Sequence, residues 1–417
     1  MGQTVFIPRE LDANEPRVAA SPETVKRLVG LGFEVIVEKG AGLGSRIPDL
    51  DFASAGGAIG AAADARKADV VLKVRRPTDA ELKGYKSGAA VIAIMDPYGN
   101  DAAVAAMAKA GVTAFSMEFM PRITRAQSMD VLSSQANLAG YQAVIDAAAE
   151  YDRALPMMMT AAGTVPAARA FIMGVGVAGL QAIATARRLG AVVTATDVRP
   201  AVKEQVQSLG AKFLAVEDEE FKAAETAGGY AKEMSKEYQA TQAALTAEHI
   251  AKQDIVITTA LIPGRPAPKL VSAAMVASMR PGSVIVDLAV ERGGNVEGAV
   301  PGKVVTTENG VKIVGHLNVP GRVAASASLL YAKNLYAFLE TMVDKAAKEL
   351  AIKRDDELVK ATMLTDGGKV VHPNFANAAE APRTEPAAIP ATFLVADAAD
   401  KKPTPKKKSA AKPKGTV

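Results

Sequence analysis

The sequence predicts an α/β protein with two doubly wound domains, each with a parallel sheet, joined by long helices. Short apolar runs alternate with helical segments in two successive series, which is the pattern of strands connected by crossover helices. A long helical pattern separates the two series. The 417 residues also exceed what one hydrophobic core usually serves, so two domains are expected.

The first series covers about the first 120 residues. Its strands are expected at residues 4–8, 33–37, 69–74, 89–95 and 112–117. Ser21 and Pro22 are typical of an N-cap and a first helical residue, so they predict a helix between the first two strands. Right-handed crossovers between strands at this spacing predict a parallel sheet.

The second series follows a helix that we expect at residues 133–154. Its strands are expected at 169–173, 192–196, 212–216, 254–258, 283–288 and 312–314, with helices at 179–189 and 200–209. A helix at 324–346 would return the chain to the first domain. The predicted domains are residues 1–135 with 325–377, and residues 136–324. Residues 378–417 are rich in Ala, Pro and Lys and are expected to be a disordered tail.

Composition excludes several kinds of function. Cysteine is absent, so disulfides, thiolate nucleophiles and cysteine-based zinc sites are excluded, and no metal site is expected. Residues 401–417 hold seven lysines and no acid, so the rest of the chain carries about −3 of the total charge of +4, and no nucleic-acid partner is expected. No secretory signal is visible, and prolines and glycines interrupt the apolar stretch at 155–186. We therefore expect a cytoplasmic chain without a transmembrane helix of its own.

A glycine-rich segment follows the first strand of the second series, with the sequence Gly174-Val175-Gly176-Val177-Ala178-Gly179. A strand, this turn and a helix in that order are typical of a Rossmann dinucleotide-binding site, in which the backbone approaches a pyrophosphate. A purely structural glycine turn is the alternative. Asp197 ends the next strand, 18 residues after Gly179, and is expected to accept hydrogen bonds from the adenosine ribose.

Asp197 predicts NAD(H) rather than NADP(H), because a carboxylate repels a 2′-phosphate. Val198 and Arg199 follow this acid and are included in the predicted cofactor site. Arg199 is the one feature that favours a 2′-phosphate. A solvated arginine at a helix start is the simpler interpretation of that residue.

Proton-transfer residues are scarce. A dehydrogenase that acts on a carbonyl usually needs a histidine or lysine beside it. The three histidines are His249, expected on the surface, His372, near the end of the ordered chain, and His316, at a strand end, where a structural role is favoured over lining the cleft. Hydride transfer between two nicotinamides needs no acid or base, only close approach of the rings with water excluded.

A polar segment ends the first series, where a cleft between the domains is expected. Its candidate residues are Arg122, Gln127, Asp130 and Ser133. Their side chains could bond the ribose and carboxamide of a cofactor held in that cleft. A charged helix start explains the same residues equally well, and both interpretations stay open.

Five longer segments are distinctive. They are MPRITRAQSMDVLSSQANLAGYQAVIDAA, LPMMMTAAGTVPAARAFIMGVGVAGLQAIATARRLGAVVTATDVRP, AETAGGYAKEMSKEYQ, ITTALIPGRPAP and GSVIVDLAVERGGN. They resemble the NAD(H)-binding subunit, or domain I, of the proton-translocating nicotinamide nucleotide transhydrogenase family, and the resemblance covers roughly residues 1–375.

This resemblance implies a role for each matching residue. Arg122, Gln127, Asp130 and Ser133 would contact the dihydronicotinamide end of NADH. A mobile loop that contains Gly229 and Tyr230 would fold over the bound nucleotide, and Thr259, Ala260 and Leu261 would border it. None of these roles follows from composition or spacing.

The resemblance also implies the partners. NADH bound here would pass hydride to NADP⁺ held on a partner subunit, coupled to proton movement through membrane-embedded subunits. The chain would form a homodimer on the cytoplasmic face of the bacterial inner membrane. The lysine-rich tail could tether it electrostatically to anionic lipid or an acidic partner surface, or merely add solubility.

Two other functions are considered. Alanine dehydrogenase belongs to the same wider family, and matches to its lysine and arginine stand at Lys73 and Arg17. Its catalytic histidine would follow the strand at 89–95, where this chain has Met95-Asp96-Pro97. Asp96-Pro97-Tyr98 also departs from the transhydrogenase pattern, which leaves the shape of that loop open. A non-catalytic NAD sensor is the third possibility.

Overall fold

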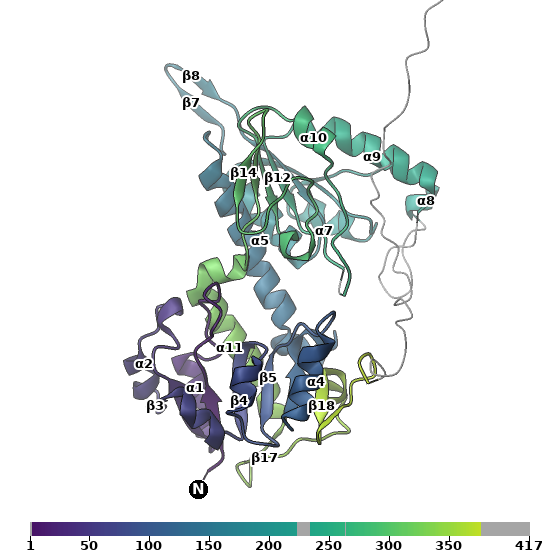
Figure 1. The fold of residues 1–417 in the computed structure, drawn as a ribbon. Coiled ribbons are helices and arrows are strands. Elements are labelled where there is room, and N and C mark those ends of the chain that lie inside the picture. Colours follow the sequence, from purple (N-terminus) through teal and green to yellow (C-terminus); the bar gives the residue numbers. More distant parts are fainter. Residues whose placement is uncertain (1, 223–233, 263, 377–417) are drawn as a thin grey trace, which may run out of the picture.

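The computed structural model describes residues 2–222, 234–262 and 264–376. The expected tail and the loop residues Gly229 and Tyr230 lie outside this part of the chain. Figure 1 shows two lobes, each built on one sheet, which we call the first and the second lobe.

The first lobe contains an eight-stranded sheet in the order β19-β18-β6-β5-β4-β1-β2-β3. Its strands are β1 (Thr4–Ile7), β2 (Glu34–Glu38), β3 (Ala58–Gly60), β4 (Val70–Arg75), β5 (Ala90–Ile94), β6 (Thr113–Ser116), β18 (Met363–Asp366) and β19 (Lys369–Val370). Strands β1 to β6 pair in parallel, whereas β18 runs antiparallel to β6 and β19. Its helices are α1 (Pro22–Gly30), α2 (Asp49–Ser54), α3 (Asp79–Leu82), α4 (Asp101–Lys109) and α12 (Glu357–Thr362).

The second lobe contains a seven-stranded sheet in the order β11-β10-β9-β12-β13-β15-β14. Its strands are β9 (Arg169–Met173), β10 (Val192–Thr196), β11 (Lys212–Phe213), β12 (Ile255–Thr258), β13 (Val284–Asp287), β14 (Val304–Thr306) and β15 (Lys312–Val314). Only β14 is antiparallel. Its helices are α6 (Val177–Arg188), α7 (Val202–Ser208), α8 (Glu219–Lys222), α9 (Lys236–Ile250) and α10 (Ala273–Ser278). The predicted doubly wound α/β class is confirmed, with antiparallel strands added at the edges of both sheets.

Two long helices connect the lobes. In Figure 1, α5 (Val131–Glu150) runs from the first lobe into the second, and α11 (Ala324–Thr341) leads back. Gly140 of α5 lies against the start of α6, where an added Cβ would come within 2.0 Å of the Ala178 carbonyl oxygen. Glycine therefore permits the close crossing of these two helices. Helix α11 ends five residues before its predicted end, because the chain turns into a short hairpin of β16 (Val343–Asp344) and β17 (Glu349–Leu350).

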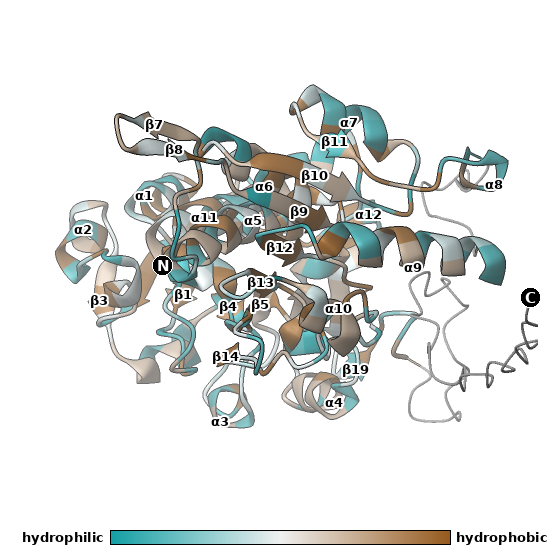
Figure 2. Cartoon of the chain, turned by 90° about the horizontal axis from the view of Figure 1, so that it is seen from above, coloured by the Kyte–Doolittle hydropathy of each residue, from teal (hydrophilic) through white to brown (hydrophobic). Residues whose placement is uncertain are grey.

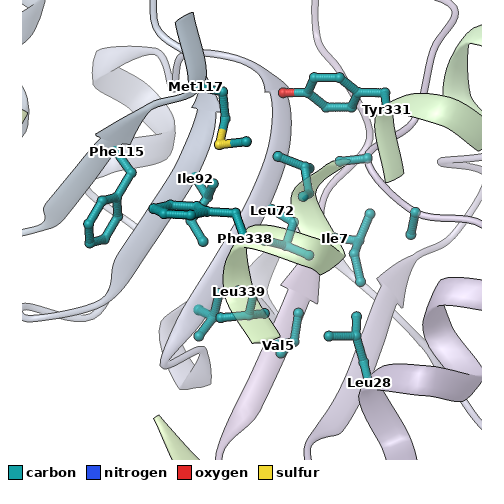
Figure 3. Packing of buried hydrophobic residues seen from close by; sticks show 14 of the residues in the cluster. Val5, Ile7, Leu28, Leu72, Ile92, Phe115, Met117, Tyr331, Phe338 and Leu339 are labelled. Carbon is teal, nitrogen blue, oxygen red and sulfur yellow. The ribbon is translucent and has the colours of Figure 1, made fainter. Parts of the chain in front are cut away.

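The larger of the two hydrophobic clusters of the first lobe lies between its sheet and α11. Figure 3 shows Phe338 and Leu339 of that helix packed among strand residues that include Val5, Leu72 and Ile92. In Figure 2, the buried strands of the second sheet are brown at the centre and α7 and α8 are largely teal at the periphery. No helix within the described residues is long and apolar enough to cross a membrane.

A hairpin of β7 (Met158–Thr160) and β8 (Gly163–Val165) projects from the second lobe (Figure 1). Met157 and Met159 on this hairpin arm are 61% and 76% exposed. Exposed methionines on a projecting arm are typical of a surface that another chain covers.

Candidate functional site

The glycine-rich segment forms the turn between β9 and α6, and each of its glycines has a different surrounding. An added Cβ would lie 2.6 Å from the Thr259 hydroxyl at Gly174, which has φ +98°, and 1.9 Å from the Gly174 carbonyl oxygen at Gly179. At Gly176 an added Cβ would meet nothing within 4 Å. Close packing therefore requires glycine at Gly174 and Gly179. Gly176 instead faces open space, where its backbone can approach a bound ligand closely.

Asp197 lies beside this turn, directly after β10. Its Oδ2 accepts the Val175 amide N–H at 2.7 Å. Its Oδ1 accepts the backbone N–H of Arg199 at 2.9 Å. The predicted acid and the predicted glycine turn are therefore joined directly, across 22 residues of chain.

Arg199 folds back onto Asp197. Its Nε and Nη2 donate to the two oxygens of the carboxylate at 2.9 and 3.0 Å, and Nη2 also reaches the Val175 carbonyl oxygen at 3.2 Å. Val198 forms the half-buried bend between the two residues. The expectation of a solvated arginine at this position was wrong, since the guanidinium is engaged by the acid beside it.

Residues 259–261 follow β12 and border the same turn. The Thr259 hydroxyl donates to the Gly174 carbonyl oxygen at 3.1 Å, and the side chain of Leu261 is exposed. Asn295 is fully buried and holds Ala260 by accepting its N–H at 3.1 Å and donating to its carbonyl at 2.9 Å. Sequence reasoning missed Asn295, because its partners lie 35 residues away in the chain.

The polar segment of the first lobe forms a short 3₁₀ helix, Thr124–Met129, followed by α5. Asp130 is the N-cap of α5 and accepts the backbone N–H of Ser133 at 2.9 Å and its hydroxyl at 2.5 Å. Arg122 and Gln127 have exposed side chains. The helix-start interpretation is thus correct for Asp130 and Ser133. Their oxygen atoms keep lone pairs that can accept further hydrogen bonds from a ligand.

Helix α5 sets the distance between this segment and the glycine turn. From Asp130 to Gly140 are ten residues of helix, which is roughly 15 Å at 1.5 Å per residue. Gly140 touches the first turn of α6, as described above. One helix therefore fixes the spacing of two polar sites: one lies at its N-terminus in the first lobe, and the other lies beside its midpoint in the second lobe.

Asp96 follows β5 and has a left-handed backbone, with φ +46°. Its carboxylate pairs with Arg292 of the second lobe and lies 3.7 Å from Arg76. The half-buried carboxylate of Glu118 accepts the backbone N–H groups of Met95 and Asp96 at 3.0 and 2.5 Å. Burial raises the pKa of Glu118, against the hydrogen bonds that it accepts.

A second contact joins the lobes near Asn318, which also has a left-handed backbone. Its Nδ2 donates to the Asn14 carbonyl oxygen of the first lobe at 2.7 Å, and its backbone N–H donates to Glu291 at 2.6 Å. The carboxyl ends of both sheets therefore face each other across these loops, which is where ligands bind in open α/β sheets.

The two cations that match alanine dehydrogenase are buried in the first lobe and paired with acids. Arg17 donates to both oxygens of Glu15 and to Gln135, and Lys73 lies 2.5 Å from Glu81 and 3.4 Å from Glu10. Burial acts to raise the pKa of Glu15, but Arg17 outweighs it and the pKa is lowered; burial raises the pKa of Glu10. A cavity of about 440 Å³ lies beside them, lined by residues 9–13, 15–17, 40, 41, 43 and 44.

None of the three histidines has a fully exposed ring, and two of them, His249 and His372, pack against aromatic side chains. His249 was expected on the surface, but its Nε2 lies 2.8 Å from the Thr194 hydroxyl and its ring meets Phe171 edge-on at 4.8 Å. His372 is buried and stacks on Phe119 at 4.7 Å, and His316 is half-buried after β15. Burial lowers the pKa of each. The three rings are therefore neutral near pH 7.

Comparison with known proteins places these features in context. The family described as alanine dehydrogenase/PNT, N-terminal domain, matches residues 6–139, and the corresponding C-terminal domain family matches residues 143–373. The first of the polypeptides that make up an NAD(P) transhydrogenase subunit alpha from Rhodospirillum rubrum is 58% identical over 376 residues, which is 88% of this chain and 98% of that protein.

Two further proteins cover most of the chain. The crystal structure of a transhydrogenase from Sinorhizobium meliloti is 71% identical, with a TM-score of 0.82, over 88% of this chain and all of the solved one. An alanine dehydrogenase from Methanococcus maripaludis is 30% identical over 91% of this chain and 97% of its own length. The chain is thus similar over most of its length to proteins named transhydrogenase and to one named alanine dehydrogenase. Its sequence identity with the transhydrogenases is greater.

Proposed function

The chain belongs to the alanine dehydrogenase/PNT family, and from this premise we propose that it is the NAD(H)-binding subunit of a transhydrogenase. In this proposal it transfers hydride from NADH to NADP⁺ held on a partner subunit. Residues 136–324 form the NAD(H)-binding domain, and residues 1–135 with 325–377 form the first domain. The observation that carries the proposal is one hydrogen bond. In it Asp197, the acid at the end of β10, accepts the N–H of Val175 in the glycine-rich turn.

The adenosine half of NAD(H) is assigned to this pair. The open space at Gly176 and the N-terminus of α6 suit a pyrophosphate, because backbone N–H groups and the helix dipole favour an anion there. Asp197 takes the ribose hydroxyls. Residues 259–261 form the wall that Asn295 holds in place.

The nicotinamide half is assigned to the N-terminal end of α5. Arg122 and Gln127 are exposed and can turn toward a ligand without disrupting the core, whereas Asp130 and Ser133 are fixed by capping. We assign positioning of the dihydronicotinamide to these four residues. Loop residues Gly229 and Tyr230 would cover the nucleotide, as the family resemblance implies.

Alanine dehydrogenase activity is the second candidate, favoured by the relative from Methanococcus and by buried Arg17 and Lys73. Against it stands Asp96, which follows β5 where that chemistry requires a histidine, and which is paired with arginine. The pairing leaves this position without a neutral base that could take a proton from an alcohol or amine.

The proposed assembly includes a second copy of the chain and membrane-embedded subunits that couple hydride transfer to proton translocation. The methionine-bearing β7–β8 hairpin supports a homodimer, because it projects from the second lobe (Figure 1) and its methionine side chains are exposed. Location at the cytoplasmic face of the inner membrane, through partner subunits and the lysine-rich tail, belongs to the same proposal.

A mixing assay tests it. The purified chain is combined with its NADP(H)-binding partner subunit, and NADH-dependent reduction of the thionicotinamide analogue of NADP⁺ is followed by absorbance. We expect turnover only when both proteins are present. Turnover of alanine with NAD⁺ by the chain alone would favour the second candidate, and NADH binding without either activity would favour an NAD sensor.

A further inference from the structure

The carboxylate of Asp197 occupies a complete anion site made by its own neighbours. Four N–H donors converge on its two oxygens: the Val175 amide, the Arg199 amide, and Nε and Nη2 of the Arg199 guanidinium. All four distances lie between 2.7 and 3.0 Å. Asp197 is only 8% exposed, so these donors are arranged around a largely desolvated negative charge.

This arrangement has the parts of a 2′-phosphate site. A planar guanidinium that donates two parallel hydrogen bonds, with backbone N–H groups beside it, recognises phosphate as well as carboxylate. The site lies at the end of β10, where dinucleotide-binding folds distinguish the ribose 2′-hydroxyl from the 2′-phosphate.

We propose that Asp197 is a built-in anion that closes a latent 2′-phosphate site, and that Arg199 is the residue that would bind NADP(H) once the acid is removed. The inference rests on the proposed nucleotide site and deepens it by naming what sets its specificity. The acid excludes NADP(H) in two ways: it occupies the donors, and it repels a phosphate that carries up to two negative charges.

Arg199 is therefore a positioning residue while Asp197 is present and a specificity residue when it is absent. In the present structure its guanidinium fixes the carboxylate from one side while Val175 fixes it from the other. The ribose hydroxyls of NADH have to share this carboxylate with Arg199. A phosphate in its place would keep every one of the four donors.

The test compares NADH and NADPH binding to the full chain by fluorescence titration. In Asp197→Ser, we expect NADH to bind more weakly and NADPH to bind at least about tenfold more tightly than to the unmodified chain. In the double variant Asp197→Ser with Arg199→Ala, the gain for NADPH should disappear. Asp197→Asn keeps the size of the side chain and removes only its charge, so it should show a smaller gain.

Arg188→Ala is the matched control, because it removes one positive charge at the exposed C-terminal end of α6, outside the site. It should leave both affinities unchanged, with or without Asp197→Ser. NADPH binding that stays weak in both Asp197→Ser and Asp197→Asn, while circular dichroism shows folded protein, would overturn the inference. A gain that survives Arg199→Ala would overturn the role of Arg199. NADH binding by the unmodified chain tests the proposed function separately.

Discussion

Asp96 and Arg292 form an ion pair between the two lobes, although 196 residues separate them in the chain. Asp96 reaches it from a left-handed backbone that Glu118 holds by its two accepted N–H bonds. Tyr98 of the same loop packs toward Gly264 of the second lobe, where an added Cβ would lie 3.0 Å from the ring. The loop after β5 is therefore built as a contact between lobes, in the position where a dehydrogenase would carry a proton donor.

Breaking this pair should change stability little. Both side chains are more than a third exposed, and exposed pairs contribute at most about 1 kcal/mol. We expect Asp96→Asn and Arg292→Met each to lower the free energy of unfolding by less than that amount. The double variant should lose no more than either single one, as measured by urea denaturation. Additive losses would show that the two residues act independently.

Substitutions at two glycines of the glycine-rich segment should separate an effect on protein stability from an effect on NADH binding. Gly179→Ala places a Cβ 1.9 Å from the Gly174 carbonyl oxygen, so we expect a loss of roughly 1–3 kcal/mol in unfolding free energy together with weaker NADH binding. Gly176→Ala meets open space and is the matched control for stability. It should fold as the unmodified chain does and still bind NADH more weakly. Unchanged NADH affinity in Gly176→Ala would contradict the proposed pyrophosphate position.

The acid at the strand end should matter mainly for binding. We expect Asp197→Ala to weaken NADH binding by roughly 1–3 kcal/mol, the range for losing hydrogen bonds to a charged group. Isothermal titration at constant salt measures the effect. An affinity within twofold of the unmodified chain would show that the ribose binds elsewhere.

Gln127 should affect hydride transfer more than binding. It is exposed, so Gln127→Asn should leave the unfolding free energy unchanged. The shorter side chain would misplace the nicotinamide without releasing the nucleotide, and hydride transfer should slow more than the Kd for NADH rises. Single-turnover kinetics with the partner subunit separate the two quantities. Equal losses in both would argue against a positioning role.

His249 should give stability a pH dependence. Burial lowers its folded pKa below the ordinary value near 6.5, so the neutral ring is favoured in the folded state. Its contribution is fully present above pH 6.5 and is lost as the pH falls toward the lowered pKa. We expect His249→Gln to flatten the decline of unfolding free energy between pH 8 and 5. Parallel curves for the two proteins would show that His249 does not titrate on unfolding.

The strands buried on both faces could be predicted from sequence, and the exposed edges could not. Strands β1, β5, β9 and β12 consist mostly of apolar residues, because helices cover both faces of a parallel sheet. In contrast, β3 and β14 are short and largely exposed, and β18 joins the first sheet from the far end of the chain. Their sequences carry no comparable pattern, since tertiary pairing determines them.

The same limit applies to the candidate site. Glycine spacing and the strand-end acid were enough to predict the turn and Asp197, because both are local features of one β-α-β unit. The engagement of Arg199, the support by Asn295 and the pairing of Asp96 with Arg292 depend on where separate loops meet in space. A residue type alone does not reveal its partner.

Direct hydride transfer between two nicotinamides is the central claim, and isotope transfer tests it most directly. NADH that carries deuterium at the transferred position of C4 is mixed with NADP⁺, this chain and its partner subunit in ordinary water, and the NADPH formed is examined by mass spectrometry. The account predicts that the deuterium appears in NADPH without dilution, because no group of the protein exchanges it with solvent. NADPH without the label, or no NADPH in the presence of both proteins, would contradict it.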